Sequence, residues 1–172
     1  MANLEEIKSS LNSNSALTED IKNSIMELVV TFNNAFPGVD LSNLSERLKT
    51  LKIIRGSQFL IKGTSRYNPI DNELLISFVK INNCDCKHVL MREILNIITA
   101  KDNYTGFNQD NIFEALNVGY TEMLANFLVG NDTNEYEDEV IATNMICKIV
   151  GEDKMYEAYF TNNAKLLMNE VY

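Results

Sequence analysis

The central helix of this chain is encoded by the stretch Val89-Leu-Met-Arg-Glu-Ile-Leu-Asn-Ile-Ile-Thr99. Its apolar side chains would cover most of the circumference of a helix, which is typical of a helix buried inside a domain. Three polar residues, Arg92, Glu93 and Asn96, interrupt this apolar surface. Helical spacing places them on one side of the helix. Because a buried charge is costly unless it is paired, we expect a partner to face them.

The next long helical segment offers that partner within Ala115-Leu-Asn-Val-Gly-Tyr-Thr-Glu-Met123. Glu122 interrupts this apolar segment as Arg92 interrupts the first one, and Val118 lies one helical turn before Glu122. We therefore predict that Arg92 is largely buried and pairs with Glu122, Glu93 or both. By itself, such a network indicates only that two helices pack together through a salt bridge.

The run from residue 67 to residue 130 resembles the gluzincin branch of the zincin metallopeptidases. These enzymes carry an HExxH zinc motif on one helix and a glutamate ligand on a second helix. Arg92-Glu-Ile-Leu-Asn96 stands at the HExxH positions. Val118 stands where the third ligand would be. Glu122 stands where the family keeps a carboxylate that orients the first histidine. The resemblance implies a zincin-like fold around these two helices.

The departures from the motif decide the function that the resemblance implies. A zincin site needs two imidazoles at i and i+4 and a carboxylate, whereas this chain offers Arg92, Asn96 and Val118. Arginine is a permanent cation, valine has no donor atom, and asparagine is a poor zinc ligand. Glu93, which would polarise the zinc-bound water, is retained. Without zinc, however, the pKa of that water would not fall from ~16 toward ~7, so no useful nucleophile would form. We therefore expect a catalytically inactive zincin-like protein, without cofactor, that binds a protein or peptide partner.

The only other group of metal-binding residue types is Cys84-Asp-Cys86-Lys-His88. Structural zinc sites add a second, distant pair of ligands, which this chain does not offer. Cys147 makes the number of cysteines odd, so no disulfide framework follows. We expect Cys84 and Cys86 to be ordinary cysteines before a helix, although a metal at Cys84, Cys86 and His88 stays open.

Two other functions remain as alternatives. One is an active hydrolase, which would use a metal displaced to Cys84, Cys86 and His88 or a metal-free mechanism at Glu93 and Glu122. The other is a small acidic protein of a mobile element that modulates its host, which only the size and the acidity suggest. Metal content separates the first alternative from an inactive binding protein.

Charge and hydropathy exclude several classes of partner. The 172 residues carry a formal net charge of −9, which argues against binding to nucleic acid or to anionic lipid. No apolar run is long enough to span a membrane. The N-terminal stretch lacks the basic and apolar regions of a secretory signal, so we expect a cytoplasmic protein. The acidic run 131–139 does not fit the calcium-binding EF-hand pattern, which needs glycine at the sixth position and glutamate at the twelfth. It therefore indicates a solvated loop and first helical turn.

The pattern as a whole predicts a mostly helical α+β fold in a single zincin-like domain, residues 1–172. Residues 1–50 should be helical, residues 51–79 should form a small antiparallel β-sheet, and residues 85–172 should be helical and carry the vestigial site. The expected helices cover residues 18–36, 89–100, 111–129, 136–150, 155–160 and 164–171. A shorter helix that carries Leu44 and Leu48 is also expected, and Asp40 or Ser42 can cap it. The expected strands cover residues 51–55, 58–62 and 73–79, with a turn at 68–72.

Overall fold

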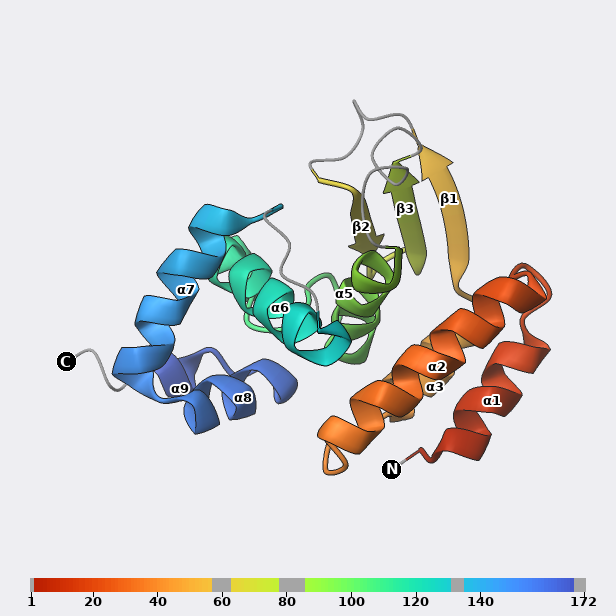
Figure 1. Cartoon of the computed structure of the whole chain (residues 1–172), viewed down its shortest axis with the longest axis horizontal. Coiled ribbons are helices and arrows are strands. Elements are labelled where there is room, and N and C mark those ends of the chain that lie inside the picture. Colours follow the sequence, from red (N-terminus) through yellow and green to blue (C-terminus); the bar gives the residue numbers. More distant parts are fainter. Residues whose placement is uncertain (1, 57–62, 78–85, 131–134, 169–172) are drawn as a thin grey trace.

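The computed structural model describes residues 2–56, 63–77, 86–130 and 135–168. Its element order confirms the mostly helical α+β class that the sequence predicts (Figure 1). In chain order the elements are α1 (Leu4–Ser13), α2 (Glu19–Ala35), α3 (Ser42–Leu48), β1 (Lys52–Gly56), β2 (Ser65–Asn68), β3 (Glu73–Ser77), α5 (Cys86–Ile98), the 3₁₀ turn η1 (Gln109–Asn111), α6 (Glu114–Val129), α7 (Glu137–Val150), α8 (Glu152–Phe160) and α9 (Lys165–Met168).

The first N-terminal helix, α1, begins at a clear capping signal. The side chain of Asn3 accepts a hydrogen bond from the backbone N–H of Glu6 at 3.0 Å, and the Glu6 carboxylate accepts one from the N–H of Asn3 at 3.1 Å. This reciprocal capping box starts α1, a helix that the sequence pattern alone did not delimit. Helix α3 follows Leu41 without a side-chain cap of this kind, although Asp40, one of the two capping residues that the sequence suggests, accepts from the N–H of Ser42 at 3.0 Å.

The three strands form one sheet in the order β1-β3-β2. The expected antiparallel arrangement holds for β2 and β3, which are joined by the predicted turn, but β1 and β3 are parallel. The prediction is wrong for β1. Strand β3 lies between β1 and β2 in the sheet and pairs with both of them, and β1 and β3 run in the same direction. The expected strand 58–62 lies outside the described residues, and β2 instead occupies Ser65–Asn68, just before Pro69.

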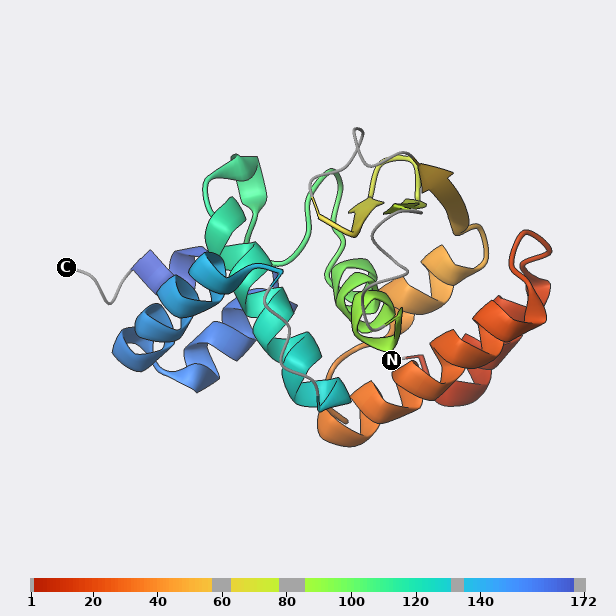
Figure 2. The same cartoon turned by 45° about the horizontal axis from the view of Figure 1, so that its top comes forward.

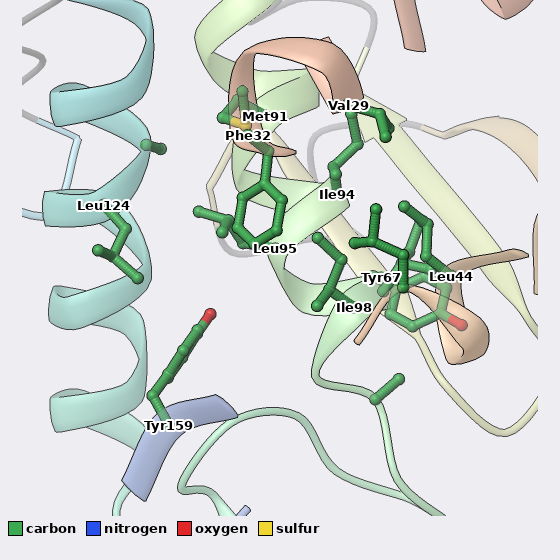
Figure 3. Packing of buried hydrophobic residues seen from close by; sticks show 14 of the residues in the cluster. Val29, Phe32, Leu44, Tyr67, Met91, Ile94, Leu95, Ile98, Leu124 and Tyr159 are labelled. Atoms are coloured by element: carbon green, nitrogen blue, oxygen red, sulfur yellow. The ribbon is translucent and has the colours of Figure 1, made fainter. Parts of the chain in front are cut away.

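Helix α5 lies at the centre of the fold, beneath the sheet and between α6 and the N-terminal helices (Figures 1 and 2). Its apolar residues join one hydrophobic core that includes side chains from α1, α2, α3, α6 and α8. Figure 3 shows this core around Met91, Ile94, Leu95 and Ile98 of α5, with Phe32 of α2 beside them. The buried helix that the sequence predicts is therefore confirmed.

The two helices expected to pack together, α5 and α6, are in contact. On the other side of α6, α7 approaches closely at Gly119. A Cβ atom there would lie 2.3 Å from both the backbone oxygen of Glu139 and the hydroxyl of Thr143. Among the described residues, no helix combines the length and the apolar character that crossing a bilayer requires.

Candidate functional site

A cleft of about 740 Å³ opens between β2, α5, the segment 103–112 and the N-terminal half of α6. Arg92, Glu93 and Asn96 line it from α5, and Val118 lines it from α6. These are four of the five positions that the resemblance to zincins singles out, and the fold brings them to one place. Glu122, one helical turn after Val118, is fully buried.

The buried guanidinium of Arg92 contacts three carboxylates beside this cleft. Arg92 is 3% exposed, and its Nη1 donates to Glu122 at 3.3 Å and to Glu135 at 2.9 Å. Its Nε lies 3.5 Å from Glu93. The expected pairing of Arg92 with Glu122 and Glu93 is therefore present. Burial opposes the charge of Arg92, but the surrounding carboxylates outweigh burial and raise its pKa above the ordinary value.

Glu93 is held from both sides. The hydroxyl of Ser65 on β2 donates to its carboxylate, and Asn96 Nδ2 donates to it at 3.1 Å. Ser65 in turn accepts a hydrogen bond from Arg92 Nη2 at 2.8 Å. The amide oxygen of Asn96 accepts from Thr105 at 3.3 Å. Asn96 therefore acts as a hydrogen-bond bridge between α5 and the segment before α6.

The proposed cysteine and histidine ligands do not share one surface. His88 is buried, and its Nε2 lies 3.4 Å from Glu122 Oε1, whereas Cys86 is exposed. Residues two apart on a helix do not face each other. Cys84 lies outside the described residues. Within the part of the chain that the structure describes, no three His, Cys, Asp or Glu side chains are grouped so as to hold a metal ion.

Glu135 and Tyr136 belong to the site, although the sequence interpretation placed them in a solvated acidic run. That interpretation is wrong for both, because they dock onto residues far away in the chain. Glu135 Oε1 accepts from the backbone N–H of Thr64 and from its hydroxyl, the latter at 2.9 Å. The ring of Tyr136 lies 5.0 Å from the guanidinium carbon of Arg92, which is within cation–π range.

The electrostatic state of these two residues follows from their surroundings. Burial alone would raise the pKa of Glu135, but the charge of Arg92 and the hydrogen bonds from Arg92 and Thr64 lower it. Burial raises the pKa of Tyr136 to about 12. Gly63 leaves room for the Tyr136 hydroxyl, because a Cβ atom at residue 63 would overlap with it.

Among the described residues, β2 is an edge strand of the sheet, and its residues Ser65, Arg66 and Tyr67 help to line the cleft. The N–H of Ser77 on β3 donates to the carbonyl of Thr64 at 2.9 Å. Hydrogen-bonded pairs alternate along antiparallel strands, so the backbone N–H and C=O groups of Ser65 and Tyr67 point away from β3. These groups are placed as they would be for pairing with one more strand.

No protein-family model, curated protein or solved structure matches this chain. What the site can do chemically is decided by its own side chains. Arg92 and Val118 offer no lone pair to a metal, and Glu93 is engaged by Ser65 and Asn96. Clefts and strand edges are places where proteins in general bind ligands and extended peptides.

Proposed function

We propose that this chain is a zincin-like protein without peptidase activity, which binds an extended peptide segment of a protein partner in the cleft beside β2. One observation carries the proposal. The positions that correspond to the zinc ligands, Arg92, Asn96 and Val118, line one cleft together with Glu93, and their side chains lack the donors that zinc requires.

The charge balance of the site supports the loss of a metal. In an active zincin, a dication would balance the carboxylates that correspond to Glu93 and Glu122. If no cation replaced it, two carboxylates would be buried without a counter-charge, which is costly. The guanidinium of Arg92 supplies the positive charge and donates to Glu122. Arginine suits this role because it is weakly hydrated and permanently charged.

The shape and lining of the cleft support an extended peptide as the ligand. Its volume of about 740 Å³ is of the size usual for ligand sites, roughly 300–1,000 Å³. The edge of β2 can pair with the backbone of a peptide by adding a strand. Ile112 is 71% exposed and lines the cleft with Ala115 and Val118, so these residues offer an apolar contact to the peptide's side chains.

We place this binding function in the cytoplasm, with no nucleic acid involved. Cys86 and Cys147 are free thiols, which suits a reducing compartment. The net charge of −9 disfavours phosphate backbones as partners.

A peptide screen tests the proposal. The full chain is titrated with a library of fluorescent ten-residue peptides, and the tightest binder is resynthesised with alternate backbone amides N-methylated. We expect N-methylation to weaken binding at least about 10-fold, or about 1.4 kcal/mol, because a methylated amide cannot donate to β2. Mass spectrometry should detect no cleavage of the peptide. Cleavage at a defined bond, or binding that is insensitive to N-methylation, would contradict the proposal.

Matched variants locate the binding. Ile112→Asp changes the lining of the cleft, whereas Ile149→Asp changes a residue of α7 with nearly the same exposure, 73% against 71%. The first substitution should weaken peptide binding at least about 10-fold. The second should leave it unchanged. Equal effects would mean that the peptide binds elsewhere on the surface.

A further inference from the structure

Three donors converge on the carboxylate of Glu135 at the start of β2. They are the Nη1 of Arg92 at 2.9 Å, the hydroxyl of Thr64 at 2.9 Å and the backbone N–H of Thr64. Arg92 and Thr64 are both buried, so their positions do not depend on flexible surface side chains. A guanidinium, a backbone N–H and a hydroxyl form a good receptor for a carboxylate.

Glu135 differs from the other two carboxylates that face Arg92. The side chains of Glu93 and Glu122 are 2% and 0% exposed and belong to the central helices α5 and α6, whereas that of Glu135 is 21% exposed. Glu135 also precedes α7 rather than forming part of a helix. Its side chain can therefore exchange with another carboxylate while Glu93 and Glu122 continue to neutralise Arg92.

The donors of Arg92 and Thr64 lie next to the start of β2, within reach of a peptide that pairs with this strand. Thr64 directly precedes Ser65, whose backbone groups point away from β3. Arg92 lines the cleft along which the peptide would lie. A carboxylate on such a peptide can reach the same three donors, and the exchange conserves charge because one carboxylate replaces another.

We propose that Arg92 and Thr64 form a carboxylate-binding pocket for the peptide partner, and that Glu135 occupies this pocket as an internal competitor when the partner is absent. This inference rests on the proposed peptide-binding function and adds the chemistry of the ligand. The carboxylate is either the C-terminus of the peptide or an acidic side chain within it. An uncharged peptide end leaves the guanidinium with one ion pair fewer, so it is disfavoured.

The test uses three short peptides and the full chain. The peptides are N-acetyl-trialanine with a free C-terminus, the same peptide as its amide, and an amide whose central residue is glutamate. The chains are the wild type, Glu135→Ala and, as a charge-matched control, Glu137→Ala, which removes an exposed acid two residues away. Binding is followed by NMR through the backbone amides of Thr64 and Tyr67.

We expect Glu135→Ala to bind the free acid at least 10-fold more tightly than the wild type or Glu137→Ala does, with the largest shift at the Thr64 amide. The amide should bind at least 10-fold more weakly than the acid. Tight binding of the glutamate-containing amide would assign the pocket to an acidic side chain, and weak binding would assign it to the C-terminus. Adding Thr64→Val, which removes the hydroxyl, should reduce the preference for the acid. If Glu135→Ala does not fold, Glu135→Gln, which removes the charge at nearly constant size, takes its place in every arm.

Two outcomes separate this inference from the proposed function. If acid and amide bind Glu135→Ala equally and shift the Tyr67 amide, the carboxylate pocket is wrong while peptide binding at β2 stands. If no peptide shifts either amide in any chain, and the library screen also finds no binder in the cleft, both proposals are wrong.

Discussion

The guanidinium of Arg92 on α5 donates to the carboxylate of Glu122 on α6 at 3.3 Å, and both side chains are buried. This pair joins α5 and α6, and in the zincin-like function that we propose it takes the place of the metal. Because Glu93 and Glu135 also lie within 3.5 Å of Arg92, the arginine is the cation at the centre of three acids.

Removing the charge of Arg92 should destabilise the fold strongly. Arg92→Ala leaves buried carboxylates without their cation, which usually costs roughly 3–5 kcal/mol. The double variant Arg92→Met with Glu122→Leu should cost much less than the sum of the two single variants, since both charges leave together. Urea denaturation of the four chains measures these costs. A loss below about 0.5 kcal/mol for Arg92→Ala would be that of an exposed surface arginine.

The stability that Glu135 provides should depend on pH. Its pKa in the folded state is lowered from the ordinary value of 4.5, so the unfolded chain binds the proton more readily. The contribution is therefore complete above about pH 4.5 and is lost as the pH falls through the lowered pKa. The difference in unfolding free energy between wild type and Glu135→Gln should shrink between pH 6 and pH 3. A difference that stays constant over this range would mean that the Glu135–Arg92 pair does not form in solution.

Restoring the missing ligands should create a zinc site. The triple variant Arg92→His, Asn96→His, Val118→Glu supplies two imidazoles and a carboxylate around the same cleft, and Glu93 and Glu122 are already present. Its zinc affinity, measured by calorimetry, should exceed that of the wild type at least about 10-fold. The double variant that keeps Val118 is the control and should gain less. If the folded triple variant binds zinc no better than the wild type, the geometry is not that of a zincin.

The contact between α6 and α7 should be sensitive to a single methyl group. Gly119→Ala places a Cβ atom 2.3 Å from the backbone oxygen of Glu139, so the helices must separate, at a cost of about 1–3 kcal/mol. Gly38→Ala is the control because nothing lies within 4 Å of the added atom. Thermal unfolding of both variants measures the effect. Equal stability of the two variants would exclude this close approach.

The sequence predicts the buried pair Arg92 and Glu122 better than it predicts Glu135, which is partly exposed. Arg92 and Glu122 each break an apolar helical surface, and two such anomalies can be matched from the sequence alone because each is costly without a partner. Glu135 offers no comparable signal. It lies in an acidic run whose other members, such as Glu137 and Asp138, are exposed. Only the docking of Glu135 on Thr64, 71 residues earlier in the chain, distinguishes it from its neighbours.

The parts of the fold that escaped prediction depend on short or distant signals. The capping box of Asn3 and Glu6 is present in the sequence and would have delimited α1. The alternation of exposure along β2, with Ser65 and Tyr67 buried and Arg66 exposed, spans too few residues to be separated from the turn at Pro69. The parallel pairing of β1 with β3 is set by the order of the strands in the sheet, which local patterns do not encode.

The metal content of the purified chain tests the central claim most directly. The full chain is produced in zinc-supplemented medium, purified without chelator and analysed by mass spectrometry for metals, and its melting temperature is compared with and without EDTA. The account predicts less than about 0.1 zinc per chain and an unchanged melting temperature, because a site built around Arg92 offers zinc no ligand set. One zinc per chain, with a melting temperature that falls by several degrees in EDTA, would contradict it.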